Sequence, residues 1–210
     1  MKILSGVISS LTLLSLNVVG LSQVQAAPKG FEFQPVPVSF FGNGCPKGTA
    51  EAILNGDTLS VTFSAFEVIA PSPKVVSKSC SLRTGLNVPS GLNVQPINVK
   101  YIGFADVPTK GSADLNVKIL FQGREVDTDN NQNATFPAGF SDVYNKNVGI
   151  TLGTINACKK KVSTTFGINS TLTARAISVP PGQESQIRID TIDTTLGPVL
   201  FQIKFAFNPC

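Results

Sequence analysis

Apolar and polar residues alternate one by one along much of this 210-residue chain, and no other feature limits its possible folds as strongly. Successive side chains of a β-strand point to opposite faces, so this pattern is typical of a strand with one buried face. Leu59, Val61 and Phe63 alternate with polar neighbours in this way. The clearest run closes the chain: Val199, Phe201, Ile203, Phe205 and Phe207. Helical periodicity is hard to find, so we expect an all-β protein.

Turn-forming residues separate the alternating runs at short intervals. Asn55-Gly56 joins the runs 50–54 and 58–69, and it predicts a β-hairpin because both residues tolerate positive φ angles. A slip in the alternation at Gln95-Pro96 predicts a bulge or bend within the run 92–107. The other expected strands are 80–84, 115–122, 148–157, 162–174, 185–192 and 199–207, and the polar segment 124–144 is expected to be a loop. This arrangement predicts a single-domain antiparallel β-sandwich, with a jelly roll as one form that it could take.

The N-terminus has the composition of a secretory signal peptide. Lys2 precedes the uncharged, largely apolar stretch 3–21, and Val24-Gln25-Ala26 has the small-x-small form of a cleavage site. Removal of residues 1–26 would leave an extended lead-in, 27–40, followed by the sandwich domain, 41–210. The alternative is a transmembrane anchor, but serine, glycine and asparagine interrupt the stretch and no basic cluster follows it. No later segment has the ~18 apolar residues of a membrane span, so we expect a secreted or cell-surface protein.

The composition excludes several functional classes. The sequence contains no histidine, which removes Ser–His–Asp triads, Cys–His dyads and histidine metal ligands. The whole chain has 17 basic and 13 acidic residues, and without Lys2 its net charge is only about +3. A nucleic-acid-binding protein normally carries a dense basic face, so we expect no nucleic-acid partner. The run Lys159-Lys160-Lys161 is expected to be a solvated strand end or loop.

An even number of cysteines in an exported chain favours disulfides, and this chain has four: Cys45, Cys80, Cys158 and Cys210. A metal site is the alternative, but no two of them have metal-ligand spacing. Four cysteines allow three pairings. We expect Cys45–Cys80 and Cys158–Cys210, one bridge for each half of the chain. The other option for Cys210 is to stay free or to pair between chains.

Three segments, taken in order, point to a known family. The first is Gly42-Asn43-Gly44-Cys45-Pro46-Lys47-Gly48-Thr49. The second is Cys80-Ser81-Leu82, followed by Pro89-Ser90-Gly91 and by Tyr101-Ile102-Gly103-Phe104-Ala105. The third is Cys158 with the closing Asn208-Pro209-Cys210. In this order they resemble domain-of-unknown-function family 4360, small secreted proteins of bacteria and filamentous fungi, over about residues 40–210.

The resemblance implies secretion, β-structure and paired cysteines, and it implies no activity. Members of that family often have a Trp shortly before the third cysteine and another near the final Pro-Cys. This chain has Ile155 and Phe207 in those neighbourhoods and no Trp at all. The resemblance therefore does not carry an aromatic binding surface over to this chain.

Two loops partly match ligand-binding motifs. The segment 42–49 lacks the Walker spacing, because Lys47 stands where glycine is needed. The segment 127–133 places Asp and Asn at alternate positions, like the start of a calcium loop. Gln132 replaces the required glycine and Ala138 the bidentate glutamate, which excludes an EF-hand. An irregular calcium site and a solvated loop tip are both left open there.

Other chemistry-bearing residues are scattered. Asn133-Ala-Thr135 and Asn169-Ser-Thr171 match the glycosylation pattern, which matters only in a eukaryotic host. No spacing selects a pair of carboxylates for glycoside hydrolysis. Tyr101, Phe104 and Tyr144 are candidates for a sugar-stacking platform, although packing in the core is the favoured interpretation.

Together these observations predict a secreted, non-enzymatic β-sandwich with a structural or interaction role at the cell surface or outside the cell. We expect no catalytic residue, cofactor or metal, and the residues singled out are the disulfide cysteines. The alternatives are a carbohydrate-binding module, and an effector or inhibitor that acts on a protein partner. The expected partners are accordingly a cell-wall polysaccharide or an extracellular protein, with the neutral polar composition favouring the former.

Overall fold

The computed structural model describes residues 32–55, 58–128, 131–150, 155–189 and 201–210. All regular elements in these ranges are strands, which confirms the predicted all-β class. No helix of the length and apolarity needed to cross a membrane occurs in the ranges described. The strands are β1 Glu32–Phe41, β2 Ala50–Asn55, β3 Thr58–Phe63, β4 Glu67–Pro71, β5 Val75–Val88, β6 Leu92–Asp106, β7 Ser112–Phe121, β8 Arg124–Glu125, β9 Ala134–Phe136, β10 Ser141–Gly149, β11 Ile155–Asn156, β12 Val162–Arg175, β13 Glu184–Ile189 and β14 Phe201–Pro209.

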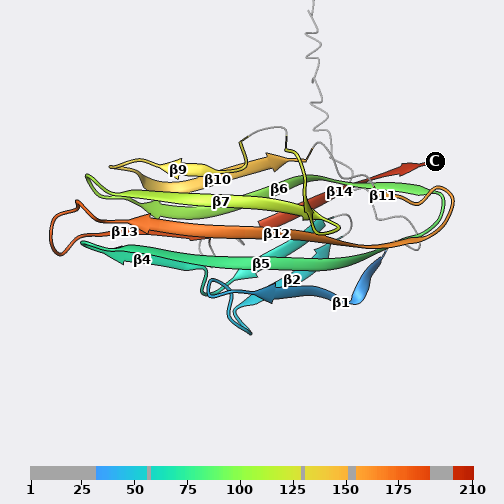
Figure 1. Ribbon diagram of the computed structural model, residues 1–210, viewed down its shortest axis with the longest axis horizontal. Helices are drawn as coiled ribbons and strands as arrows, with labels where there is room; N and C mark the ends of the chain where they lie inside the picture. The colour runs from blue at the N-terminus through green and yellow to red at the C-terminus, as the bar shows by residue number, and fades with distance from the viewer. Residues whose placement is uncertain (1–31, 56–57, 129–130, 151–154, 190–200) are drawn as a thin grey trace, which may run out of the picture.

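The strands form two sheets, all of whose pairings are antiparallel (Figure 1). Sheet A has the order β1-β5-β12-β7-β8, with β9 also paired to β7. Sheet B has the order β2-β3-β14-β6-β13-β4, with β10 and β11 also paired to β6. The long strands β5, β12 and β7 lie side by side along the longest axis of the molecule (Figure 1). This arrangement confirms the predicted antiparallel sandwich.

The inward faces of the two sheets form one hydrophobic core. In β5 from Cys80 onward, and in β7 as far as Ile119, every second residue is buried, as the alternation in the sequence predicts. Leu86, Leu115 and Ile168 are among the largest fully buried side chains. A buried polar contact also joins the sheets, because the Tyr101 hydroxyl of β6 lies 3.0 Å from the hydroxyl oxygen of Ser170 in β12.

The expected hairpin forms, but its second strand is shorter than predicted. Strands β2 and β3 pair along their whole length from Ala50–Phe63 to Asn55–Thr58. The run 58–69 then breaks after Phe63, and residues 67–71 form β4, which pairs with β13. Phe66 fills the break and is almost completely buried. The buried apolar positions change from odd numbers up to Phe63 to even numbers from Phe66 onward, so the alternation shifts by one residue where the chain changes strand partners.

Three other boundaries differ from the sequence-based expectation. The short strand expected at 80–84 is the middle of the 14-residue β5. Residues 32–41, expected to belong mostly to a lead-in, form β1 and pair with β5 at the edge of sheet A. The expected loop 124–144 contains β8, β9 and the start of β10. Backbone pairing with long neighbours stabilises these polar or proline-containing segments as strands, although their own sequences do not predict it.

Other predictions agree with the structure. The pairing of β14 with β6 shifts register between Lys204 and Phe205, opposite the segment where Gln95-Pro96 predicted a bulge. The strands expected at 92–107 and 162–174 correspond to β6 and β12. The middle of the expected strand 148–157 and the end of 185–192 fall outside the described residues. Residue 199 and the side chains of 201–206 also fall outside the described residues, so the alternation expected in the last strand is not tested there.

Candidate functional site

Both predicted disulfides are present. Cys45 pairs with Cys80, at a sequence separation of 35, and Cys158 pairs with Cys210, at a separation of 52. No free cysteine occurs in the described part of the chain. Motif segments surround both bridges, with 42–49 and 80–82 at the first and 89–91, 158 and 208–210 at the second.

The glycine-rich loop 42–49 is fastened to β5. The Gly44 N–H donates to the Ser79 carbonyl at 2.9 Å, and the Asn43 side-chain oxygen accepts from the Ser79 N–H at 2.8 Å. Gly42 has a φ angle of 125°, and a Cβ there would lie 2.1 Å from the Ser79 oxygen. These glycines are needed because the loop lies directly against a strand. The loop therefore has a structural role, holding the chain against β5, and is not a phosphate-binding loop.

The turn around Gly91 is hydrogen-bonded to both chain segments that the second disulfide joins. The Gly91 N–H donates to the Ala157 carbonyl, and the Cys210 N–H donates to the Gly91 carbonyl, each at 3.0 Å. The motif segments around 89–91, 158 and 208–210 therefore meet in one place. Ile155 and Phe207, at the positions near which tryptophan is common, are both buried. In this chain those two positions contribute to the core and not to a surface.

The Tyr101-to-Ala105 segment also has a structural role. Tyr101 is buried, and desolvation raises the pKa of its hydroxyl far above the usual range, an effect that the hydrogen bond to Ser170 opposes. Tyr144 is buried too, and its hydroxyl donates to the Arg188 carbonyl at 2.9 Å. Phe104 is half-buried on the outer face of sheet B, with the Arg188 guanidinium 5.2 Å from its ring centroid. The three aromatics therefore form no common platform, as the favoured interpretation predicted.

The outer face of sheet A gathers polar side chains from three long strands, and we call it the polar face. Its members alternate with the buried residues of β5, β12 and β7, and the strand register places them in rows across the sheet. They are Ser77, Ser79, Ser81, Arg83 and Asn87 of β5; Ser163, Thr165, Asn169, Thr171, Thr173 and Arg175 of β12; and Ser112, Asp114, Asn116 and Lys118 of β7.

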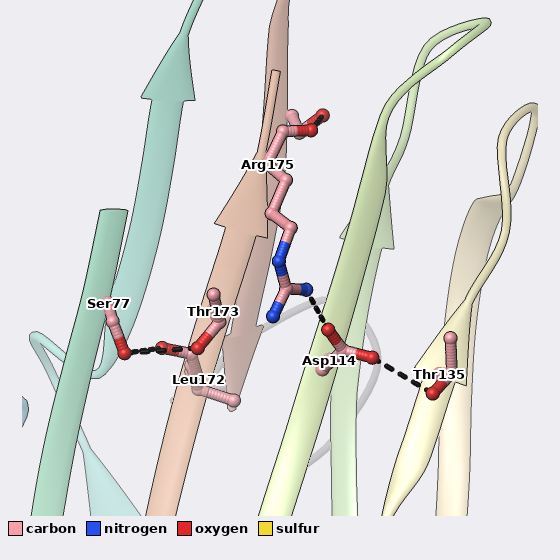
Figure 2. A network of polar contacts seen from close by, with 7 residues as sticks. Ser77, Asp114, Thr135, Leu172, Thr173 and Arg175 are labelled. Carbon is pink, nitrogen blue, oxygen red and sulfur yellow. Dashed lines mark hydrogen bonds and ion pairs between the residues drawn. The ribbon is translucent and has the colours of Figure 1, made fainter. Parts of the chain in front are cut away.

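Hydrogen bonds between neighbouring strands order this face. Ser77 and Thr173 lie 3.0 Å apart through their hydroxyl oxygens, and Ser79 and Thr171 lie 2.9 Å apart. Figure 2 shows the first pair, with the Ser77 hydroxyl also donating to the carbonyl of Leu172. These bonds fix the hydroxyl groups in position, and although Thr173 itself is buried, its neighbours Ser77, Ser79 and Thr171 form an ordered polar array that solvent reaches.

An ion pair extends the array to β9. The Arg175 guanidinium contacts the Asp114 carboxylate, which also accepts a hydrogen bond from the Thr135 hydroxyl at 2.9 Å (Figure 2). A second ion pair joins Lys118 of this face to Glu125 of the neighbouring strand β8 at 3.3 Å. Asp114 of the face and the adjacent Glu125 are therefore both paired with cations. Among the described residues no group of three or more Cys, Asp or Glu side chains could hold a metal ion.

Two amide oxygens of the candidate calcium loop already accept backbone hydrogen bonds. The Asn131 side-chain oxygen accepts from the Asn133 N–H at 3.0 Å, and the Asn133 oxygen accepts from the Val117 N–H at 2.9 Å. Asp129 lies outside the described residues, so an irregular calcium site and a solvated loop tip are both left open here. The glycosylation patterns at Asn133 and Asn169 are likewise left open. Asn169 lies on the polar face, where its side-chain oxygen accepts a hydrogen bond from Arg83 at 2.8 Å.

The comparison with protein families decides the relationship that the motif segments indicated. Over residues 32–210 the sequence matches the model of domain of unknown function 4360. The chain belongs to this family. Because the match covers β1 through β14, the family domain includes the edge strand β1.

Comparisons with individual proteins add little to the family assignment. No curated protein matches the chain. One solved structure that resembles this family member is TmCBM61 in complex with beta-1,4-galactotriose. It shares 14% sequence identity over 85% of this chain and 91% of that chain, with a TM-score of 0.22. A similarity at that TM-score carries no argument about ligand or fold.

Sequence reasoning did not find the polar face of this domain-4360 protein. The signal was present, because Ser, Thr and Asn occupy the alternate positions opposite the apolar ones in 75–87 and 163–175. It was missed because β5 was expected to be only five residues long, which left Ser77 and Ser79 outside any strand. The pairing of β5, β12 and β7 comes from contacts distant in sequence, which periodicity cannot give.

Proposed function

We propose that this protein is a secreted, non-enzymatic binding protein and that its polar face binds an extracellular polysaccharide. The observation that carries the proposal is the ordered array of hydroxyl and amide groups across β5, β12 and β7. Sugars expose hydroxyl groups that both donate and accept hydrogen bonds. Ser, Thr and Asn side chains have the same double capacity, so the face is chemically suited to them.

The charges of the face support a binding role rather than a catalytic one. Asp114 of the face and Glu125 of the neighbouring strand β8 are each paired with a cation. A carboxylate engaged by a neighbouring cation is not available as a free acidic group beside a substrate. The lack of histidine removes the commonest catalytic base as well.

The disulfides support an extracellular location. Disulfides persist in oxidising compartments and are rare in the cytosol. Cys45–Cys80 and Cys158–Cys210 are both formed. The signal-peptide pattern of residues 1–26 agrees with this location.

A protein partner is the second candidate, and the outer face of sheet B favours it. Val143 of β10 is 50% exposed and pairs with Phe104 of β6, beside the guanidinium of Arg188. Aromatic and arginine side chains are common at protein interfaces. An effector or inhibitor would use this surface and leave the polar face free.

An array of cell-wall and extracellular polysaccharides tests the proposal with the oxidised mature chain, residues 27–210. We expect saturable binding to one class of polymer, and loss of that binding after the disulfides are reduced. Absence of binding to every polymer by a folded, oxidised sample would contradict the proposal. Capture of a protein by wild type, lost on Val143→Asp, would then support the second candidate.

A further inference from the structure

A pocket opens on the polar face between β12 and the turn that joins β7 to β8. Its volume is about 490 Å³, and it is open to solvent on one side. Specific small-molecule sites commonly measure ~300–1,000 Å³. The residues that matter for its chemistry are Arg83, Gln122, Gly123, Ser163, Thr165 and Gly167.

Arg83 is fixed at this pocket without a carboxylate partner among the described residues. Its guanidinium donates to the Leu82 carbonyl at 2.7 Å and to the Asn169 side-chain oxygen at 2.8 Å. A longer contact of 3.5 Å reaches the carbonyl of Ile168. All three acceptors are neutral, so the positive charge is not compensated by them. A guanidinium has five N–H donors, and these contacts leave some of them available.

Gly167 makes this position of Arg83 possible. A Cβ at residue 167 would lie 2.7 Å from the Arg83 Cδ and 2.9 Å from its Nη1. The arginine side chain therefore crosses the central strand β12 at a residue that has no side chain. Glycine weakens the interior of a strand, and it often marks a place where another group approaches closely.

The surroundings of the pocket favour a negatively charged ligand. The register places Glu125 next to Leu120 at the pocket wall, but the Glu125 carboxylate is paired with Lys118 at 3.3 Å. Ser163, Thr165 and Gln122 also line the pocket, and the Ser163 hydroxyl donates to the Asn87 side-chain oxygen at 2.8 Å, which leaves its own oxygen able to accept. The pocket thus combines one held cation with neutral hydrogen-bonding groups.

We propose that the Arg83 pocket binds the carboxylate of an acidic sugar, such as a uronic acid unit of the polysaccharide. This inference rests on the proposed function and specifies its ligand class. Arginine recognises a carboxylate through two parallel N–H···O bonds, and the neighbouring hydroxyl and amide groups match sugar hydroxyls. The pocket is continuous with the polar face through Asn169, so a bound chain would extend from the pocket onto the face.

The test follows backbone amide signals by NMR while the oxidised mature chain is titrated with sodium glucuronate, glucose or N-acetylglutamate. Glucuronate and glucose share a ring and differ at C6, whereas N-acetylglutamate supplies a carboxylate without a sugar. We expect saturable shifts at Gly123, Thr165 and Gly167 with glucuronate, and much weaker ones with the other two. Arg83→Gln should weaken glucuronate binding at least about tenfold, because a charge-assisted bond is lost.

Two further variants keep the result interpretable. Arg83→Lys retains the charge without the planar fork, so we expect intermediate affinity. Lys110→Gln removes one positive charge in the turn before β7, at the other end of that strand, and should leave affinity unchanged.

Equal shifts with glucose, or binding unaffected by Arg83→Gln, would overturn the pocket assignment while polysaccharide binding still stands. Equal affinity for N-acetylglutamate would overturn the sugar assignment and indicate an acidic peptide. Glucuronate binding without any polysaccharide binding would contradict the proposed function alone.

Discussion

Gly103 shows how one residue without a side chain shapes the core of this fold. A Cβ there would lie 2.1 Å from the Arg188 carbonyl oxygen and 2.5 Å from the Tyr144 hydroxyl oxygen. The glycine therefore makes room for the tyrosine hydroxyl to reach the backbone of β13. Gly167 has the same relation to Arg83 on the outer face. The sequence shows both glycines but does not show which group approaches them, since that group comes from another strand.

Gly103→Ala should lower the free energy of unfolding by about 2–3 kcal/mol, because the added methyl group overlaps a backbone oxygen. The measurement is urea unfolding of the oxidised mature chain. Gly182→Ala is the control, since Gly182 has a φ angle of 83° and no other group lies within 4 Å of the place a Cβ would take. Its cost should be about 1 kcal/mol, from backbone strain alone. Equal costs for the two variants would contradict the close packing at Gly103.

Tyr101 predicts a pH dependence of stability. Burial raises the pKa of its hydroxyl in the folded protein, while an unfolded tyrosine ionises near pH ~10. The unfolded chain therefore loses this proton first, and the stabilisation disappears as the pH rises above that value. Tyr101→Phe should cost about 1–2 kcal/mol at pH 7, because the Ser170 hydroxyl loses its partner. Its stability should then fall less steeply than that of wild type above pH ~10. Parallel urea-unfolding curves for the two proteins across pH 9–11 would contradict this account.

At the scale of elements, the two disulfides close loops of similar length. Sequence separations of 35 and 52 correspond to about 4 kcal/mol each in the chain-entropy model. Any difference in the stability that the two disulfides contribute should therefore come from how deeply their cysteines are buried. Cys45 and Cys80 are 1% and 2% exposed, whereas Cys210 is exposed. The first bridge contributes packing in addition to the restriction of the unfolded chain.

The double variant Cys45→Ala/Cys80→Ala should accordingly be less stable than Cys158→Ala/Cys210→Ala, by about 1–2 kcal/mol. Free energies of unfolding in urea give the comparison. Hydrogen exchange supplies a local check, since loss of the second bridge should expose the Cys210 and Gly91 amides selectively. The opposite order of stability would show that loop closure, and not burial, sets the contribution of each bridge.

How far the sequence predicts an element depends on whether that element's own residues determine it. Strands β7 and β12 alternate clearly, and β6 alternates on either side of the slip at Gln95-Pro96, because each strand has one face in the core; all three were expected. The hairpin turn at Asn55-Gly56 was expected for the same local reason. Strands β1, β8 and β9 were not, because the pairing of their backbones with β5 or β7 stabilises them. The disulfide pairing was predicted correctly from the division of the chain into halves.

At the scale of the whole molecule, the residues of the family-like segments build the sandwich, and the candidate site lies elsewhere. Hydrogen bonds connect these segments to strands distant in the sequence, at the loop 42–49, the turn at Gly91 and the segment 101–105. The polar face and most of the Arg83 pocket are made by the outward side chains of β5, β12 and β7, to which those segments contribute Ser81 alone. Sequence motifs could identify the family for this reason, and could not identify the site.

A pair of matched variants tests the central claim that the polar face binds polysaccharide. Asn116 on β7 is an exposed residue of that face, and Asn145 on β10 is an exposed asparagine on the outer side of sheet B. The measurement is a calorimetric titration of wild type, Asn116→Arg and Asn145→Arg with the polymer that wild type binds on the array. We predict that Asn116→Arg weakens binding at least about tenfold and that Asn145→Arg leaves it unchanged. Unchanged affinity in Asn116→Arg, or a loss confined to Asn145→Arg, would show that the polar face is not the binding surface.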